Sequence, residues 1–225
     1  MPRAQRVCFS GALYHVYQRG NNKQDIFVDD MDRWHILKLI LESKKEFDYI
    51  LHCYALMKNH FHVAIEAQTI IPISKIMHYI DASYAAYFNA RHNKKGHLFQ
   101  GRFKASLVEK DYYLLELSRY IHLNPVRAGL VSLPEDYIWS SYRAYIGYKR
   151  DILADTDTLL EYFNANDREM AQQEYKKFVE SAISSDFMKK DWLKDNLKRQ
   201  RFLGSPEFVS TYQAKKAPGQ CLKSA

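Results

Sequence analysis

Residues 49–66 read YILHCYALMKNHFHVAIE and predict a β-hairpin. Residues 49–57 and 60–66 are rich in β-branched and aromatic residues, and the two-residue Lys-Asn segment between them has the length of a tight hairpin loop. Because side chains alternate along a strand, the phenylalanine, valine and isoleucine of the second strand share one face, while His60 and His62 share the other. The hairpin therefore predicts an apolar face that packs on the core and a second face that carries two histidines.

Strands and helices alternate on both sides of this hairpin. The expected elements are a strand over residues 12–18, a helix ending near 47, a helix over roughly 72–91, a strand near 102–109 and a helix over 111–124. We expect the last helix to end at Pro125, because a proline drives the preceding residue out of the α region. The order β-α-β-β-α-β-α predicts an α+β fold of the split βαβ, ferredoxin-like kind, an antiparallel sheet with helices on one face.

The sequence changes character after Pro134, and we place a boundary near Gly147. Residues 155–203 predict two or three amphipathic helices, so residues 148–225 are expected to form a helical C-terminal appendage. The last ten residues are expected to be frayed. One basic cluster of this region is expected to be a solvated helix face: Lys189, Lys190, Lys194, Lys198, Arg199 and Arg201.

The composition is that of a folded, basic protein. Hydrophobic residues make up 47% and charged residues 26% of the 225 residues, which excludes a disordered tail. The formal charge of +7 indicates a polyanionic partner, and nucleic acid fits best. The 17 tyrosines could stack on bases, although at least half of the aromatic rings are expected to lie in the core.

Three cysteines lie far apart and form no CxxC pair, so neither a disulfide framework nor a thiolate zinc site is predicted. No apolar run is long enough for a signal peptide or a membrane span. We therefore expect a cytoplasmic protein that has no contact with a membrane.

His60 and His62 could bind a metal ion, because residues i and i+2 of a strand project from the same face with Cα atoms about 7 Å apart. This spacing alone is weak evidence. A chain with nine histidines produces it by chance, and half-buried histidines usually have a structural role.

The helix predicted over 111–124 supplies further candidate groups. At 100° per residue, Tyr113, Tyr120 and Asn124 lie on one stripe that borders the apolar face, so the helix could present a phenol and an amide oxygen to the histidines. For Tyr113 we favour a role in capping the core. Two imidazoles and an amide oxygen suit Mg²⁺ or Mn²⁺, and a nearby phenol could attack a phosphodiester and become covalently linked to it.

Four segments, in a fixed order, carry a resemblance to a known family. They are residues 18–21 (QRGN) with Ile26-Phe27, residues 55–62 (ALMKNHFH), residues 96–104 (GHLFQGRFK) and residues 118–129 (SRYIHLNPVRAG). With these segments the chain resembles the HUH single-tyrosine transposases, in particular the REP-associated tyrosine transposases of bacteria. The similarity spans roughly residues 10–147, which would form the catalytic domain.

The resemblance implies a role for each matching residue. His60 and His62 would hold the divalent metal, Tyr120 would form a 5′-phosphotyrosine link and release a 3′-hydroxyl, and Asn124 would be the third metal ligand. It further implies a protein that acts at the bacterial nucleoid. Relatives include monomers as well as homodimers that exchange the tyrosine helix, so the sequence leaves open whether Tyr120 acts in cis or in trans.

Basic residues near these segments are candidates for DNA contact. Five Lys or Arg occur between residues 91 and 104, interleaved with Phe99 and Phe103, a pattern suited to phosphates and unstacked bases but also found in solvated loops. The predicted DNA-binding residues are Arg19, Asn21, Lys94, Lys95, Arg102 and Lys104.

Three functions remain open at the level of sequence. The first is a DNA endonuclease and strand transferase that recognises single-stranded or hairpin, REP-like DNA and cleaves it through Tyr120. The second is a regulator that binds DNA or RNA hairpins without cleaving them. The third is a metal-dependent hydrolase in which a bound water attacks and Tyr120 has only a structural role.

Overall fold

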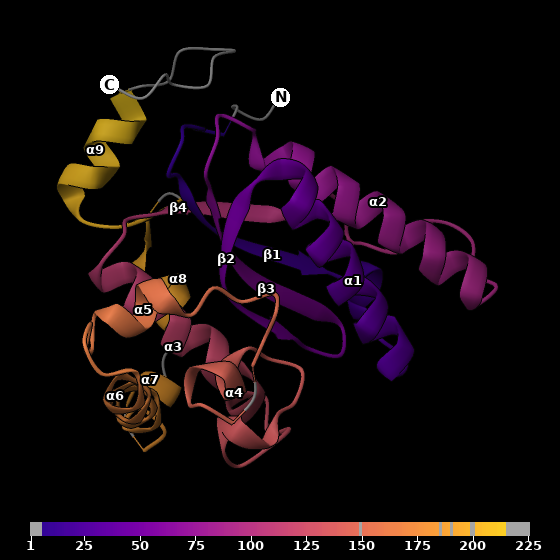
Figure 1. The fold of residues 1–225 in the computed structure, drawn as a ribbon. Coiled ribbons are helices and arrows are strands. Elements are labelled where there is room, and N and C mark those ends of the chain that lie inside the picture. The colour runs from indigo at the N-terminus through magenta and orange to yellow at the C-terminus, as the bar shows by residue number, and fades with distance from the viewer. Residues whose placement is uncertain (1–5, 149, 185, 190, 199–200, 215–225) are drawn as a thin grey trace.

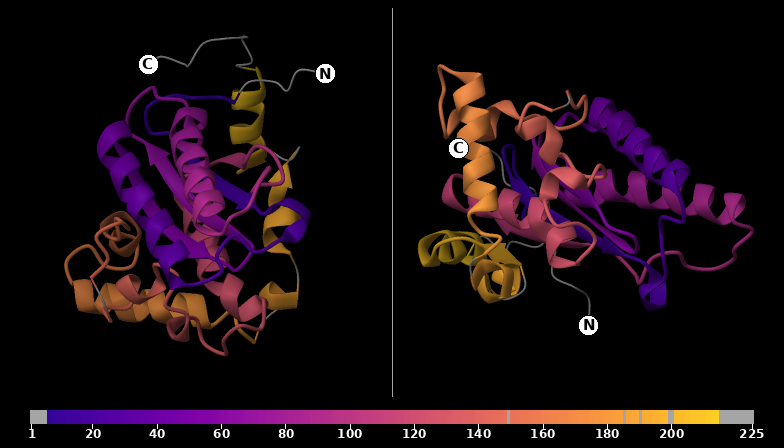
Figure 2. Two further views of the ribbon diagram at one scale, coloured as in Figure 1. Left: turned by 90° about the vertical axis from the view of Figure 1, so that its right-hand side faces the viewer. Right: turned by 90° about the horizontal axis from the view of Figure 1, so that it is seen from below.

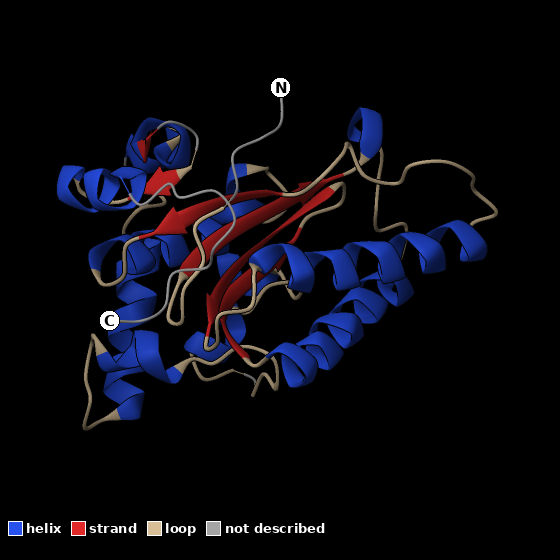
Figure 3. Cartoon of the chain, turned by 90° about the horizontal axis from the view of Figure 1, so that it is seen from above, coloured by secondary structure: helices blue, strands red, loops and turns tan. Residues whose placement is uncertain are grey.

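The central sheet of the protein has six strands in the order β2-β3-β1-β4-β6-β5 within the part of the chain that the structure describes. The structure is a computed structural model, and it describes residues 6–148, 150–184, 186–189, 191–198 and 201–214. The strands are β1 (Leu13–Arg19), β2 (Tyr49–Leu56), β3 (His60–Ala67), β4 (Lys104–Val108), β5 (Leu197–Lys198) and β6 (Phe202–Leu203). Figure 3 shows the strands running through the middle of the molecule between helical layers.

The first four strands confirm the ferredoxin-like prediction. β1 lies between β3 and β4 and pairs with both in antiparallel fashion, and β2 pairs antiparallel with β3. The hairpin is present as predicted, with Met57 N–H donating to the His60 carbonyl across its short loop. Helices α1 (Asp30–Phe47) and α2 (Ile73–Arg91) connect these strands, and Asp29 caps α1 by accepting from the Asp32 N–H.

As predicted for a ferredoxin-like core, the two connecting helices share one face of the sheet, whereas α3 lies on the other face. Helices α1 and α2 cover the face that carries Tyr14, Val16 and the apolar side chains of β3. Helix α3 (Tyr112–Arg127) packs on the other face, where Ala55 and Ala64 leave room for it. Figures 1 and 2 show the two layers on opposite sides of the sheet. Since α3 carries Tyr120 and β3 presents its histidines on this same face, the second layer brings the candidate residues together.

The predicted end of α3 at Pro125 is wrong, because the helix continues to Arg127. Proline lacks the N–H that would donate to residue i−4, and its ring crowds the carbonyl of that residue, but the N–H groups that follow it can still donate. The next turn still closes, since the Ala128 N–H donates to the Asn124 carbonyl at 2.9 Å. The buried Pro125 thus lies in the final turn of the helix, and the chain leaves the helix only after Arg127.

The region after residue 147 is built into the core. Its helices are α5 (Asp157–Glu161), α6 (Arg168–Glu180), α7 (Asp186–Lys189), α8 (Trp192–Asn196) and α9 (Pro206–Ala214). These follow the short elements α4 (Tyr142–Tyr145) and η2 (Pro134–Asp136), and η1 (Asn21–Lys23) follows β1. Tyr175 of α6 shares a core cluster with α3, and β6 pairs in parallel with β4. The region is therefore mostly helical, as expected, but it also extends the sheet.

Two further expectations concern cysteines and membranes. Cys53 is a free, buried thiol, whereas Cys8 is disulfide-bonded, which the wide spacing of the cysteines did not predict. Within the described ranges, no helix has the length and apolar character needed to cross a bilayer. The frayed end predicted for the last ten residues lies outside the described residues.

A buried histidine joins α3 to the C-terminal region. His122 is hydrogen-bonded through Nδ1 to the Tyr175 hydroxyl at 2.7 Å and through Nε2 to the Ser141 hydroxyl at 2.8 Å. Burial lowers the pKa of His122 to about 3, so the ring is neutral in the folded protein at pH 7.

We expect His122→Ala to lower the free energy of unfolding at pH 7 by about 2–4 kcal/mol, because a cavity forms and two hydroxyls lose a partner. The unfolded histidine takes up a proton below about pH 6.5, whereas the folded one does so only near pH 3. Wild-type stability should therefore fall with acidification more than that of the variant, and the difference should shrink between pH 7 and pH 4.5. Urea unfolding at both pH values tests this, with the exposed His97→Ala as control; a constant difference would contradict it.

Candidate active site

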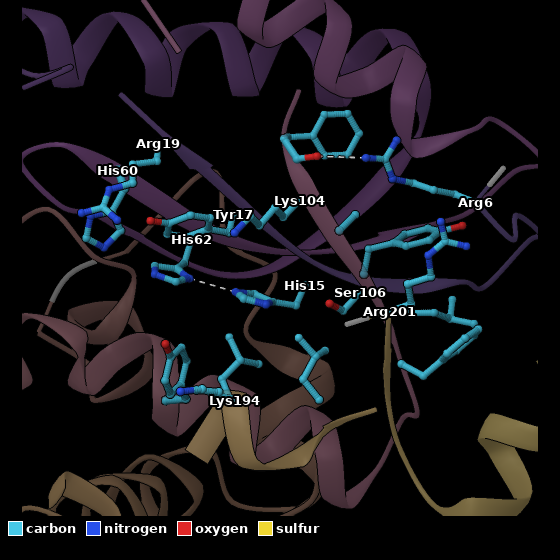
Figure 4. A pocket seen from close by; sticks show the side chains of 18 of the residues that line it. Arg6, His15, Tyr17, Arg19, His60, His62, Lys104, Ser106, Lys194 and Arg201 are labelled. Atoms are coloured by element: carbon cyan, nitrogen blue, oxygen red, sulfur yellow. Dashed lines mark hydrogen bonds between the residues drawn. The ribbon is translucent and has the colours of Figure 1, made fainter. Parts of the chain in front are cut away.

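His60 and His62 lie side by side on β3, on the face that α3 covers. Their ring centres are 5.2 Å apart with the planes nearly perpendicular. In the register of the sheet, His60 pairs with Arg19 and His62 with Tyr17 of β1, so the cross-strand neighbours project into the same space. Figure 4 shows the four side chains grouped at one end of a pocket.

Each histidine is oriented by a hydrogen bond at Nδ1. His60 Nδ1 lies 2.7 Å from Asn59 Oδ1, which can only accept, so the ring donates there and its Nε2 keeps a free lone pair. His62 Nδ1 lies 2.9 Å from His15 Nε2. In the tautomer in which His62 donates this hydrogen bond, His62 Nε2 also keeps a free lone pair. This hydrogen bond is drawn in Figure 4. Such outer contacts fix the orientation of metal-ligating histidines.

Burial keeps these imidazoles neutral. Desolvation lowers the pKa of His60 to about 4, with a further contribution from the Arg19 charge. Desolvation also holds the pKa of His62 well below its usual range, and His15, His60 and Arg127 add to this effect. Because a metal ion binds only the neutral ring, both side chains are in their ligand form at pH 7.

Tyr120 reaches the histidines from α3. Its ring centre lies 5.7 Å from that of His62 and 6.3 Å from that of His15, edge-on to both rings. The pKa of the Tyr120 phenol is raised to about 12, mainly by burial and to a smaller extent by the charge of Asp191. The Arg127 guanidinium, 4.8 Å from the centre of the Tyr120 ring, acts in the opposite direction. The nucleophile predicted from sequence is thus protonated at pH 7, between two charges that shift its pKa in opposite senses.

Asn124 is one helical turn beyond Tyr120. Its Nδ2 donates to the Tyr120 backbone carbonyl at 2.9 Å, which leaves Oδ1 as an acceptor. His60, His62, Tyr120 and Asn124 all line one pocket of about 690 Å³. The structure therefore brings together the four residues that the sequence singled out.

The donor set fits a small divalent cation. Two neutral imidazole nitrogens and an amide oxygen are suitable ligands for Mg²⁺ or Mn²⁺ with positions left open. In the parts of the chain described, no group of three or more His, Cys, Asp or Glu side chains could hold a metal. An ion at this site would therefore depend on the amide and on oxygens of water or substrate, which Mg²⁺ commonly keeps in proteins.

The six predicted DNA-binding residues are divided among three places. Arg19 and Lys104 line the pocket of Tyr120. Asn21 and Arg102 line a second pocket, on the α2 side of the sheet. Lys94 and Lys95 are exposed in the turn after α2 and border neither pocket.

The two phenylalanines of that basic segment do not act as free stacking surfaces. Both Phe99 and Phe103 are buried in the core under α2. Apolar rings without a polar tip gain more from burial than from exposure as a base platform, which explains why the pattern misled.

Several residues of the pocket were not predicted. Lys194 is exposed on α8, as expected for a solvated helix face, but it also lines the pocket, as do Arg201 and Asp191. His15 and Tyr17 could have been found from the period-2 alternation of β1, since they precede Arg19 at intervals of two. The approach of the C-terminal segment depends on tertiary packing and has no local signal.

The contact between His15 and His62 generates a prediction. We expect His15→Phe to weaken Mn²⁺ binding by about tenfold or more, because the variant keeps the stacked ring but loses the nitrogen that orients His62. Calorimetric titration of the folded variant with Mn²⁺ measures this. His35→Phe is the control, since His35 stacks on Tyr87 outside the pocket; equal dissociation constants for His15→Phe and wild type would refute the role.

Comparisons with known proteins agree with this arrangement. Residues 8–124, just over half of the chain, match the sequence model of the family described as transposase, IS200-like. No curated protein sequence matches the chain. A structure of a REP-associated tyrosine transposase bound to a REP hairpin is similar, with a TM-score of 0.55, 15% identity, and coverage of 69% of this chain and 98% of the other.

A putative transposase from Deinococcus radiodurans R1 is also similar, with a TM-score of 0.40, 14% identity, and coverage of 54% of this chain and 95% of the other. The fold is that of the REP-associated enzyme, and the family match confirms the resemblance stated from the sequence. The chain belongs to the IS200-like transposase family.

Proposed function

We propose that the protein is a DNA endonuclease and strand transferase that acts through Tyr120 on single-stranded or hairpin, REP-like DNA. The observation that carries the proposal is the edge-on contact of Tyr120 with His62 in a pocket that His60 and Asn124 also line. Family membership supports transposase chemistry, and the similar structure is of an enzyme bound to a REP hairpin.

In the proposed reaction the Tyr120 oxygen attacks a phosphorus atom of the DNA backbone. A new bond forms between the phenol oxygen and phosphorus, the phenol loses its proton, and the bond from phosphorus to the 3′ oxygen breaks. The departing oxygen takes up a proton and becomes a 3′-hydroxyl, while the 5′ phosphate stays on the tyrosine. Because the phosphodiester bond is exchanged for a phosphotyrosine bond, a second 3′-hydroxyl can reverse the step and join the strand elsewhere.

His60, His62 and Asn124 would hold the metal ion, Mg²⁺ or Mn²⁺. When bound, the ion would polarise the phosphodiester and stabilise charge on the departing oxygen. The roles of the protein are to keep the imidazoles neutral through burial and to orient them through Asn59 and His15.

Substrate binding is supported by the charge of the pocket. Arg19 and Lys104 border it on the sheet side, and Lys194 and Arg201 border it on the C-terminal side. Cations on opposite walls are suited to a phosphate backbone that passes between them. Asn21 and Arg102 would extend the contact along the strand, and Lys94 and Lys95 would contact a more distant phosphate.

The arrangement within one chain supports cleavage in cis. Tyr120 and the histidines of the same chain meet, so a monomer would suffice, and a homodimer would not need to exchange α3. We also propose that residues 1–147 form the catalytic unit and that residues 148–225 complete its DNA-binding wall. The protein would act in the bacterial cytoplasm, at the nucleoid.

Loss of the phenol oxygen tests the proposed nucleophile. We expect Tyr120→Phe to bind a labelled DNA hairpin as tightly as wild type but to give no covalent protein–DNA adduct on a denaturing gel, because only the attacking oxygen is removed. With Mg²⁺ or Mn²⁺ present, His60→Ala should also lose cleavage, by at least about 100-fold. Tyr113→Phe, on the same helix but outside the pocket, is the control.

Other outcomes assign a different function. Cleavage by the wild type without an adduct would support a hydrolase that uses water. Tight hairpin binding without any cleavage would support a regulator of DNA or RNA hairpins.

The opposite effects of Arg127 and Asp191 on the pKa of Tyr120 give a paired prediction. Asp191→Asn should speed adduct formation at pH 7 by about two- to fivefold, because an exposed charge that disfavours the phenolate is removed while the residue can still cap α8. Arg127→Gln should slow it by about tenfold or more, since the favourable charge is lost. Single-turnover rates on one oligonucleotide measure both; changes in the same direction would contradict the assignment.

A further inference from the structure

A second cavity lies on the opposite side of the sheet from Tyr120, at the end of β1. Its volume is about 810 Å³, and its wall includes Gln18 of β1, Asp81 of α2 and Gly101 of the segment before β4. Gln18 and Arg19 are consecutive in β1, so their side chains point to opposite faces, Gln18 into this cavity and Arg19 into the catalytic pocket.

The carboxyl group of Asp81 is only partly satisfied. Its Oδ2 accepts a hydrogen bond of 2.8 Å from Gln18 Nε2. Its Oδ1 is buried, and among the described residues it has no hydrogen-bond partner. Burial raises the pKa of Asp81 to about 7, and the Gln18 hydrogen bond opposes this shift only in part. A buried oxygen without a donor is costly, so its retention on a cavity wall points to a ligand that brings the donor.

The cavity is held open by fixed elements. Ser74, His78, Asp81, Ala82 and Ala85 line it from α2, and three of these five side chains are small. The opposite wall is tied to the end of β1, since the Gln100 N–H donates to the Arg19 carbonyl at 2.9 Å and Gly20 bridges to Phe99. The space is therefore preformed, as ligand pockets usually are.

The side chain that contacts Asp81, Gln18, has both of its polar atoms engaged. Gln18 Nε2 is already directed to Asp81 and, at 3.4 Å, to the Gly101 carbonyl, and Gln18 Oε1 accepts from the Arg19 N–H. A ligand that satisfies Asp81 Oδ1 must therefore carry an N–H donor, and a ligand with two adjacent donors could bind both carboxylate oxygens. Of the four DNA bases, only guanine presents two neighbouring donors, N1–H and the 2-amino group, on one edge. Adenine and cytosine place an acceptor beside their amino group, which would face the carboxylate oxygen.

The cavity also adjoins the catalytic pocket. Arg6 and Phe103 line both this cavity and the catalytic pocket, so the two spaces share a wall. Arg6 holds that wall together, because its Nη2 donates to the Phe103 carbonyl at 2.9 Å and its guanidinium lies 4.0 Å from the centre of the Phe103 ring. A strand that leaves Tyr120 along this wall would bring an unpaired base to Asp81 within a few nucleotides.

We propose that this cavity binds one unpaired guanine of the DNA substrate, with Asp81 accepting from its N1–H and 2-amino groups. The inference rests on the proposed function only in that the bound strand is DNA. Asp81 would then determine which sequence is held next to the cleaved phosphate, while taking no part in the chemistry. A carboxylate that pairs with two donors of one base discriminates by about 1–3 kcal/mol, roughly 5- to 150-fold in affinity.

The test uses binding and does not depend on cleavage. Eight-nucleotide thymidine strands with guanine, adenine, inosine or 7-deazaguanine at one central position are titrated by fluorescence anisotropy against the full chain without added metal. Guanine and 7-deazaguanine should bind about equally and at least fivefold more tightly than adenine, with inosine between them because it lacks the 2-amino donor. Failure of this order in the wild type overturns the proposal, whatever the outcome for cleavage.

Asp81→Asn provides the matched variant. It should bind the guanine strand no better than the adenine strand and keep the wild-type affinity for the all-thymidine strand. Its Tm should equal or exceed that of the wild type, because a buried and partly unsatisfied charge is removed. Asp136→Asn, at an exposed site away from both cavities, should keep the guanine preference. If Asp81→Asn still prefers the guanine strand, the assignment of Asp81 is overturned. If that variant does not fold, the series of base substitutions measured with the wild type decides whether the cavity binds guanine.

Discussion

The packing of α3 against the histidine face of the sheet is the constraint on which the site depends. Ala55 and Ala64 are small enough for the helix to approach the strands closely, and Leu117 and Ile121 fill the space between them. This approach brings the Tyr120 ring against His62 and removes both from water. The position of the Tyr120 phenol and the shift of its pKa therefore have the same cause, since the contact that positions the phenol also removes it from water.

Desolvation has opposite consequences for the two kinds of group in the pocket. It favours the neutral form of the histidines, which is the form that binds a metal ion, and it favours the protonated form of Tyr120, which is the less reactive one. Burial thus favours the proposed metal ligands and disfavours the proposed nucleophile at the same time. Arg127 offsets part of that loss, and it does so from the last turn of α3, which exists because the helix continues past Pro125.

Local patterns predicted the elements and the four central residues, whereas contacts between distant segments were not predictable. The alternation in β3 and the stripe of α3 indicated that His60 and His62 could meet Tyr120 and Asn124, and the family resemblance supplied the expected role of each. The same patterns placed α3 on the histidine face, where the structure has it. That Lys194 and Arg201 line the pocket was not predicted, since nothing in the nearby sequence indicates that the chain returns to the sheet beside β4.

The parallel pairing of β6 with β4 has a consequence for biosynthesis. Leu107 aligns with Phe202, so this edge of the sheet joins residues almost a hundred positions apart in the sequence. A nascent chain can form the hairpin and α3 early, but the cationic wall containing Arg201 cannot assemble until that late segment has emerged from the ribosome. Until then, an incomplete polypeptide on the ribosome, close to its messenger RNA, would lack part of the positive charge that binds a nucleic-acid strand.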